Sequence, residues 1–545
     1  MRFAFLPIVL LVAASAKAQE APTFPAASWF RHHLGDPRTR VELQAPLRIS
    51  DYIADEKLQL SLRAYIDLAL ENNTDIALAR LQVLSPANAI TRAFAAFDPL
   101  LTGTFSNSRA TDPVTSALQG ADTLKTLSQP VDITYQQLLP SGTAMTVSFD
   151  ALRTSTNDAF STYNPALSSS LAVTFDQPLL RNRRALTTRL NILIARSNLR
   201  VSRLQLRDQV STLLSNAENA YWDVIQAREN LLLQTRFLDL RAAALDRAQK
   251  QLDAGALLPL DIFQPRADYA SAQVAVIQSR QALAHAENTL RQQIGADLDP
   301  NLRSLPIVLT EPLSIPVVDL PDKEAAIRKA LGARPDYLAA SAGLDSDDLS
   351  IRSATDALRP AISLTGSYLS QGVSGIFNQL SNPLGGDSAV TRIPGGFSDT
   401  LGQLFGFGFP IYSFGLRLSL PIRDRAATAN LSDAQIRRRQ DALQVRKIEQ
   451  SIRLQVTNAI DDLEAIRAGM EQAEIARQFA EKRFAGEQKK YELGVTQLFF
   501  VLDAQTQLNQ AENDVLRQNI AYRRGLINLY LMTGELLNER HVALN

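Results

Sequence analysis

The sequence contains no cysteine among its 545 residues, and its 56 basic and 56 acidic side chains balance to a formal charge of zero. The lack of cysteine excludes disulfide bonds, cysteine-ligated zinc, a thiol nucleophile and a lipid anchor on cysteine. The balanced charge gives no sign of a nucleic-acid partner, which would favour an excess of basic side chains. The histidines are scattered and show no metal-ligand spacing: His32, His33, His285, His541. We find no cluster of titratable residues either, and we expect no metal, no cofactor, no catalytic residue and no enzymatic activity.

Long hydrophobic runs are also missing, apart from one at the start of the chain. Residues 1–18 combine Arg2, an apolar core and the small-residue ending Ala16-Lys17-Ala18. This pattern predicts a secretory signal peptide that is cleaved after Ala18. A membrane anchor is the alternative, but the apolar core is far shorter than the ~20 residues that cross a bilayer. We expect an exported protein that can enter a membrane only as β-strands.

The chain repeats itself. An offset of 239 residues superposes Gly255 on Gly494 and Gly295 on Gly534, and Leu- and Ala-rich runs flank each glycine. Glycine permits a turn that a Cβ would oppose, so each region is interpreted as a helical hairpin. The sequence therefore predicts a tandem duplication.

A helix is predicted in each repeat before a proline. The first spans Ser61–Phe97 and precedes Pro99, and at an offset of 261 residues its counterpart precedes Pro360. Proline cannot continue a helix, so strands are expected from these points onward.

After each proline, apolar residues alternate with polar ones over short segments. The segments are residues 145–151 and 171–175 in the first repeat and residues 362–368 and 414–420 in the second. A transmembrane barrel and a half-buried soluble sheet both use this alternation. The signal peptide and the neighbouring helices favour the barrel.

The first repeat has room for one more hairpin, formed by Val131–Leu139 and Thr143–Arg153. Three long polar or glycine-rich segments are expected to be cell-surface loops: Arg109–Ser128, Thr154–Ser168 and Ser370–Gly408.

Two proline-free stretches, after Pro178 and after Pro421, show an apolar residue at every seventh position. The positions are Val210, Ala217, Val224, Leu231, Leu238, Leu245 and Leu252, and then Val445, Ile452, Ala459, Ile466, Ala473 and Ala480. Such spacing predicts a seam against neighbouring helices, and ~70 residues would form a helix about 100 Å long.

The predicted domain organisation follows from these elements. It comprises a signal peptide (1–18), an extended arm (19–57), a first repeat (58–299), a stiff non-helical proline-rich connector (300–322) and a second repeat (323–545).

This order of helix, strands, Gln-Pro-Leu or Leu-Pro-Ile, very long helix and glycine turn, duplicated behind a signal peptide, resembles the TolC-type outer-membrane factors. The resemblance covers about residues 61–537. It implies a homotrimer whose fold combines an α-helical coiled-coil barrel in the periplasm with a transmembrane β-barrel in the outer membrane. It also implies an exit duct for an efflux pump or type I secretion system, fed by an inner-membrane transporter through a periplasmic adaptor. Family members usually have twelve strands per trimer; the extra hairpin either raises this number to eighteen or lies outside the barrel.

The resemblance also indicates residues for the periplasmic gate. Asp261, Tyr491 and Asp503 match gate positions of the family, whereas Thr496 replaces an arginine and Phe500 replaces an aspartate. An arginine-to-carboxylate latch is therefore in doubt. We expect Phe500 rings to narrow the pore and Asp503 carboxylates to favour cations. Plain helix packing is the alternative for Phe500, and a helix cap or a solvated carboxylate is the alternative for Asp503.

The hairpin turns fall where family members meet the adaptor. The matching residues are Ala254, Gly255, Ala256, Leu493, Gly494 and Val495. A simple turn is the alternative. For the whole chain, a periplasmic coiled-coil adaptor or scaffold would share the signal peptide and long helices, but would not explain the alternating strands. A secreted enzyme would need the titratable cluster that is not found.

Overall fold

The computed structural model describes residues 46–114, 121–255, 258–312, 318–380 and 390–542. Residues from Pro46 onward belong to one compact unit. The predicted signal peptide lies outside the described residues, as do residues 19–45 of the predicted arm and residues 313–317 of the predicted connector.

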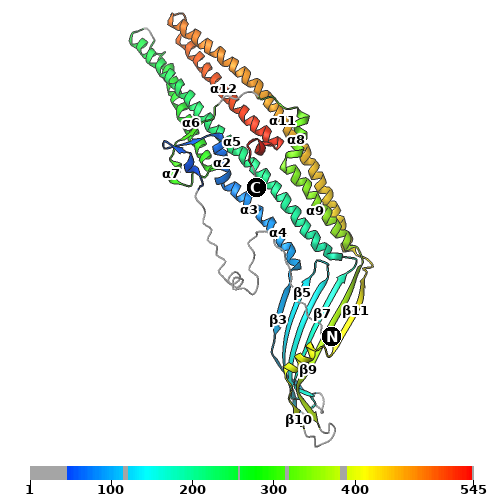
Figure 1. Ribbon diagram of the computed structural model, residues 1–545. Coiled ribbons are helices and arrows are strands. Elements are labelled where there is room, and N and C mark those ends of the chain that lie inside the picture. The colour runs from blue at the N-terminus through cyan, green and yellow to red at the C-terminus, as the bar shows by residue number, and fades with distance from the viewer. Residues whose placement is uncertain (1–45, 115–120, 256–257, 313–317, 381–389, 543–545) are drawn as a thin grey trace. The chain divides into compact units, whose positions relative to one another are not determined.

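Short helices, strands and a long helical hairpin follow one another twice along the chain (Figure 1). The elements of the first half are α2 (Leu62–Asn72), α3 (Thr74–Gln82), α4 (Leu84–Phe94), η2 (Ala95–Phe97), β3 (Leu100–Phe105), β4 (Ser108–Pro113), β5 (Thr123–Leu138), β6 (Ala144–Thr156), β7 (Tyr163–Pro178), η4 (Arg183–Ala185), α5 (Leu186–Asp253) and α6 (Phe263–Gln293). Those of the second half are α8 (Lys323–Ala333), α9 (Pro335–Ala357), β9 (Ala361–Leu380), β10 (Val390–Ile393), α10 (Phe397–Phe405), β11 (Pro410–Ser419), α11 (Arg425–Glu492), α12 (Leu498–Thr533) and α13 (Leu536–Glu539).

The single helix predicted over residues 61–97 is wrong, because three α-helices and the 3-10 helix η2 occupy this range. Asn73 leaves the helical conformation, and its side-chain oxygen accepts from the backbone N–H groups of Asp75 and Ile76 at the start of α3. Pro86 has no N–H to donate to the carbonyl of Gln82, and the helix is interrupted at Val83, between α3 and α4. The predicted switch to strand is confirmed, since β3 begins directly after Pro99 and β9 directly after Pro360.

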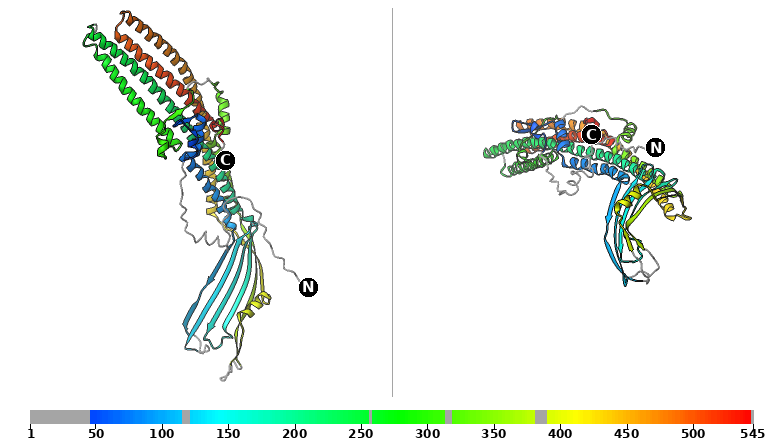
Figure 2. Two further views of the ribbon diagram at one scale, coloured as in Figure 1. Left: turned by 60° about the vertical axis from the view of Figure 1, so that its left-hand side comes forward. Right: turned by 60° about the horizontal axis from the view of Figure 1, so that its bottom comes forward.

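The main sheet joins both halves of the chain. Its strand order is β10-β9-β7-β6-β5-β3, with β4 continuing along β5 beyond β3 and β11 pairing with β9. All neighbours are antiparallel. The predicted extra hairpin is confirmed as β5 and β6, which turn through the bond from Leu139 N–H to the Thr143 carbonyl. It lies inside the sheet, between β3 and β7 (Figures 1 and 2).

The predicted surface loops are shorter than expected. Parts of all three ranges form strands β4 to β7, β9 and β10, and residues 397–405 form α10. In these strand segments most side chains are polar, and apolar and polar residues do not alternate regularly, so the sequence pattern could not reveal them. Backbone hydrogen bonds to the neighbouring strands hold the segments in the sheet.

The cross-strand register sorts the side chains of the sheet onto two faces. One face is apolar and includes Leu101, Ile133, Val147, Phe149, Leu171, Val173, Phe175, Leu364, Tyr368, Phe414, Leu416 and Leu418. The other is polar and includes Thr102, Asp132, Thr134, Ser148, Asp150, Ser170, Thr174, Asp176, Thr365, Ser367, Ser413 and Arg417. Hydrogen bonds link this polar face across strands, for example from Ser170 to Asp150 (3.1 Å).

Helices α5 and α11 contain 68 residues each, which is about 100 Å at 1.5 Å per residue. The first pairs with α6 and the second with α12. Part of the predicted sevenfold seam is buried, at Val210, Ala217 and Val224 on α5 and at Ile452 and Ala459 on α11. Among the described residues, no helix has the length and apolar character needed to cross a membrane.

The largest buried cluster ties the C-terminal end of the chain to α5. Trp222, Tyr221 and Tyr65 are almost fully buried there, and the Tyr221 hydroxyl donates to the Leu60 carbonyl (3.0 Å). The buried Glu218 carboxylate accepts two hydrogen bonds from the Arg540 guanidinium (2.7 and 2.8 Å). This bidentate pairing satisfies a charge that would otherwise be costly to bury.

The described end of the predicted arm is structured. Residues 49–54 form η1 (Ile49–Tyr52) and β1 (Ile53–Ala54), and β2 (Lys57–Leu60) pairs in parallel with β8 (Ile307–Leu309) from the predicted connector. That connector also contains one helical turn, α7 (Pro300–Arg303), where Pro300 takes the first position and Asp299 caps the turn. The prediction of a non-helical connector is therefore wrong at this turn.

Two glycines give a matched test of backbone strain and packing. Gly494 and Gly534 have φ of 73° and 75°, but a Cβ at Gly494 would meet nothing within 4 Å, whereas one at Gly534 would lie 3.0 Å from the backbone of Ala333 and Arg334. We expect Gly494→Ala to cost about 1 kcal/mol from the left-handed conformation, and Gly534→Ala to cost roughly 1–3 kcal/mol more from overpacking. The midpoint of thermal unfolding in detergent measures the difference, and equal shifts in the two variants would contradict it.

Candidate functional site

The two helical hairpins turn in the same way at their ends. Gly255 follows α5 and Gly494 follows α11. Both have φ of 73°, and a Cβ added to either glycine would have no neighbour within 4 Å. At the second turn, Val495 N–H bonds to the Lys490 carbonyl, which satisfies a free carbonyl at the helix end. Leu493 and Val495 are strongly exposed, and Ala254 is exposed as well. Ala256, also predicted here, lies outside the described residues.

Tyr491 joins the two hairpins. It lies in the last turn of α11, and its hydroxyl donates to the side-chain oxygen of Gln251 on α5 (2.8 Å). A tyrosine predicted from the resemblance is thus brought together with a residue that the sequence analysis did not single out.

Arg241 on α5 forms a second link between the hairpins. Its guanidinium is almost fully buried and pairs with Asp268 of α6 (3.2 Å). It also donates to the Thr506 hydroxyl and the Leu502 carbonyl of α12 (2.5 and 3.2 Å), and it lies over the Phe237 ring. Burial lowers the pKa of Arg241, while the nearby Asp268 charge opposes that shift. One buried cation therefore connects three helices.

Phe500 and Phe499 lie in the first turn of α12 with their rings edge to face, 5.5 Å between centroids. Phe500 is 47% exposed and Phe499 is 60% exposed. Neither ring is buried within its own chain, so packing inside the hairpin does not account for two large aromatic residues here.

Asp503 is paired with a cation within its own hairpin. Its carboxylate accepts from Arg483 of α11 (3.1 Å) and from the Gln507 amide (3.0 Å). An arginine-to-carboxylate pair is therefore present at this end of the molecule, formed by a different arginine position from the one that Thr496 replaces.

Asp261 and Thr496 lie in the turns themselves. Asp261 is exposed just before α6, and Thr496 is partly exposed before α12. Hydrogen bonding to Lys490 lowers the pKa of Glu487, and a weaker contribution comes from the Thr496 side chain. Within the described residues, neither Asp261 nor Thr496 is hydrogen-bonded to Phe500 or Asp503.

The residues missed from the sequence include Arg241, Gln251 and Arg483. A signal for Arg241 was available, because it lies three residues after Leu238 of the sevenfold seam, at the position where a second apolar residue is expected. A charged residue in that seam indicates a specific buried contact. Gln251 and Arg483 lie on exposed-looking helix turns, where the pattern gives no comparable signal.

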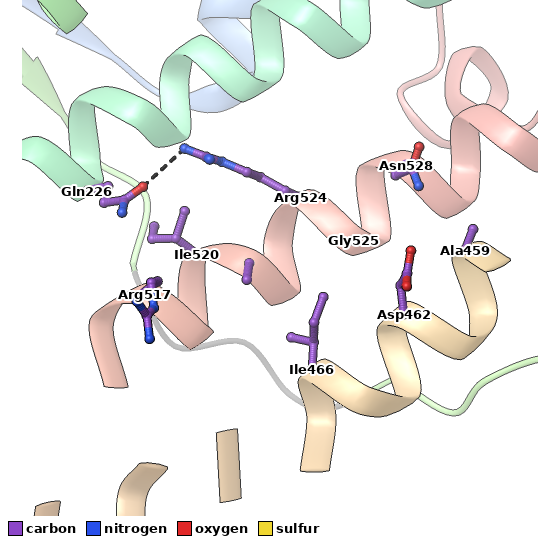
Figure 3. A pocket seen from close by; sticks show the side chains of 10 residues that line it. Gln226, Ala459, Asp462, Ile466, Arg517, Ile520, Arg524, Gly525 and Asn528 are labelled. Atoms are coloured by element: carbon purple, nitrogen blue, oxygen red, sulfur yellow. Dashed lines mark hydrogen bonds between the residues drawn. The ribbon is translucent and has the colours of Figure 1, made fainter. Parts of the chain in front are cut away.

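Further along the hairpins, a shallow groove lies where α5, α11 and α12 meet (Figure 3). Arg524 crosses it from α12 and donates to Gln226 on α5 (3.1 Å), and it also pairs with Asp223. A Cβ at Gly525 would lie 2.7 Å from the Leu463 side chain, which is why the two helices can approach closely here. The groove is a helix-packing junction.

Known proteins provide an independent comparison. Residues 326–535 match the family model described as outer membrane efflux protein. Outer membrane efflux protein BepC of Brucella suis biovar 1 is 28% identical over 337 residues, which cover 60% of this chain and 66% of that protein. The chain thus spans just under two thirds of the length of this relative.

Solved structures share the fold. A CusC crystal structure covers 91% of this chain and 99% of its own, with a TM-score of 0.61 and 19% identity. The CmeC outer membrane channel of Campylobacter jejuni covers 92% of this chain and 94% of its own, with a TM-score of 0.60 and 16% identity. The second half of the chain thus matches the outer membrane efflux protein model, and the whole chain shares the fold of solved outer membrane channels, in agreement with an outer membrane of the Gram-negative type.

Proposed function

We propose that the protein is a passive, gated exit duct in the outer membrane for an efflux pump or a type I secretion system. The observation that supports this best is the main sheet, which has one apolar face, one polar face and, within the part of the chain that the structure describes, two edges without a partner strand. The long hairpins of α5 with α6 and of α11 with α12 then extend the duct into the periplasm.

Three chains closing one barrel would remove the open edges. The sheet is six strand positions wide, because β3 and β4 share one edge and β10 and β11 share the other. An open edge in lipid would leave N–H and C=O groups unpaired at several kcal/mol each. Joining the β3 edge of one chain to the β11 edge of the next gives a homotrimeric barrel of about eighteen strands, within the range of known outer-membrane barrels.

In that barrel the apolar face meets lipid and the polar face lines the pore. Asp132 and Asp150 stand directly opposite each other on neighbouring strands of the polar face, and Asp176 lies on β7. Like charges in register are unfavourable in a dry sheet. A water-filled pore allows them.

At the other end, the hairpin contacts hold the duct nearly closed. The bonds from Tyr491 to Gln251 and from Arg241 to α12 fix one hairpin against the other. Phe500 then narrows the pore as an apolar ring, and Asp503 makes a reduced contribution to charge selectivity because Arg483 neutralises it.

The exposed hairpin turns are the proposed contact for a periplasmic adaptor, which would connect the duct to an inner-membrane transporter. Leu493 and Val495 offer apolar contact, and Gly255 and Gly494 have open space around them. Another helical hairpin could approach these turns closely.

A periplasmic adaptor or scaffold is the alternative function, and the two-faced sheet disfavours it. Two experiments distinguish the duct from the scaffold: salt-washing of the membranes, and reconstitution of the extracted chain in a planar bilayer. A duct stays with the outer membrane and passes small, discrete currents. Release by salt with no conductance would refute the duct and favour the scaffold.

A hydrophobic constriction predicts the effect of Phe500→Ala. Removing three rings should widen the narrowest part of the pore, so single-channel conductance should rise more than in Thr496→Ala, the control in the same turn. Planar-bilayer recording measures both, and equal conductance of the wild type and Phe500→Ala would rule out the constriction.

The pairing of Asp503 predicts the effect of Arg483→Gln. Freeing the carboxylate should raise the cation-to-anion permeability ratio roughly twofold, a size consistent with an exposed ion pair. Arg453→Gln makes the same charge change on α11 beside Glu449, far from the turn, and serves as the control. Reversal potentials in a salt gradient give the ratios; a similar change in both variants would show that the position of the charge is irrelevant.

A further inference from the structure

Helix α10 lies on the apolar face of the main sheet. Residues 370, 372 and 374 of β9 share the face of Tyr368, because the register with β7 is unbroken from residue 363 to residue 375. The Ser370 hydroxyl donates to the Leu404 carbonyl (2.8 Å), and the Ser374 hydroxyl donates to the Gly396 carbonyl (2.7 Å). The helix therefore runs along β9, with its C-terminal end nearest Ser370.

The helix is docked tightly. A Cβ at Gly372 would collide with the Thr400 carbonyl oxygen, and Thr400 and Leu404 are completely buried. Small residues at positions 370, 372 and 374 of β9 thus replace the large apolar residues, such as Leu364 and Tyr368, that lie on the same face nearer the start of the strand. They leave room for the backbone of α10.

The helix also covers part of a strand edge. On the side away from β7, strand β11 pairs with β9 only as far as Ser370, and β10 begins to pair at Phe377. Between them, the side-chain oxygen of Gln403 accepts from the Val373 N–H (3.0 Å). A glutamine of α10 thus takes the place of a missing strand at this residue.

The height of α10 along the proposed barrel can be estimated from β9. From Ala361 to Ser370, where the near end of α10 lies, the strand rises about 23 Å along the barrel axis, at about 3.3 Å per residue and a tilt of about 40°. The apolar band of outer-membrane barrels is about 25 Å tall. The helix therefore begins where the strands leave the hydrocarbon.

Exposed aromatic rings are concentrated at the C-terminal end of α10, whereas Phe397 at the other end is 39% exposed. At the end nearest the apolar band, Phe405, Phe407 and Phe409 are 61%, 51% and 60% exposed, and the Phe407 ring contacts Tyr368. At the far end, Ser398 and Asp399 are exposed, and Asp399 accepts from the Gly396 N–H (2.8 Å). The aromatic end continues the apolar surface of Phe414 and Leu416 on β11, which are exposed on the same face.

We propose that α10 and Phe405, Phe407 and Phe409 form an interfacial anchor that inserts into the lipid at the outer surface of the membrane. The inference rests on the proposed function, since it takes the apolar face to be the lipid-facing one. Aromatic rings are favoured at the boundary between headgroups and hydrocarbon, and an amphipathic helix lies stably in that zone. Helix α10 packs on β9 and β7, so it covers the apolar face near the β10 and β11 edge and lies away from the β3 and β4 edge.

The test uses the absence of cysteine in the chain. Phe405→Cys is labelled with an environment-sensitive fluorophore and reconstituted in phosphatidylcholine vesicles that contain lipids with a quencher near the headgroup or deep in the acyl chain. We expect loss of emission with the shallow quencher and little loss with aqueous iodide. Ser398→Cys, at the polar end, should show the reverse. Phe407→Cys repeats the measurement if Phe405→Cys fails to fold.

Two more positions separate this inference from the proposed function. Phe149→Cys lies on the apolar face of β6 and Ser148→Cys on the polar face. Deep-lipid quenching at residue 149 together with iodide quenching at residues 405 and 407 would overturn the anchor and leave the duct intact. No lipid quenching at residue 149 would overturn both.

Discussion

The pairing of backbone N–H and C=O groups along the main sheet is the constraint on which the structure depends. Its strands join residues from both halves of the chain. Among the described residues, β3 with β4 on one side and β10 with β11 on the other have no further partner strand. In hydrocarbon such edges are not tolerated. In the proposed duct, the apolar face contacts lipid, and further chains close the two edges of the sheet.

The same constraint explains smaller features. Where β11 ends, Gln403 supplies the acceptor that a strand would have offered. Where strands give way to helices, Asp424 caps α11. In the long hairpins every central backbone group is satisfied within a helix, so these elements can extend about 100 Å with a narrow apolar seam. What specifies their relative position is then a small set of polar links, of which the buried Arg241 is the clearest.

The sequence predicted the elements that have a strong period or a clear stop. The prolines at residues 99 and 360 mark the starts of β3 and β9, the sevenfold seam marks α5 and α11, and the glycines mark the hairpin turns. The sequence did not predict the polar strand segments that lie within the expected surface loops. Backbone hydrogen bonds hold these segments in the sheet, and side-chain polarity does not report such bonds. Helix α10 was hidden for a related reason: it is nine residues long and its partner surface is made of serine and glycine.

The candidate site was predictable only in part. Tyr491 and Asp503 were proposed as gate residues from the family resemblance. Their partners Gln251 and Arg483 depend on the rotation of one helix about another, which local sequence patterns do not encode. The departure at Thr496 put the arginine-to-carboxylate latch of the family in doubt. Arg483 reaches Asp503 from the facing helix instead, 20 residues earlier in the chain.

The most direct test of this account is the native mass of the chain extracted from outer membranes in detergent. Shared closure of the sheet predicts a particle of three chains that resists dissociation until the sheet itself unfolds. A stable particle containing a single chain would contradict the account, because its two sheet edges would then have no partners in the membrane.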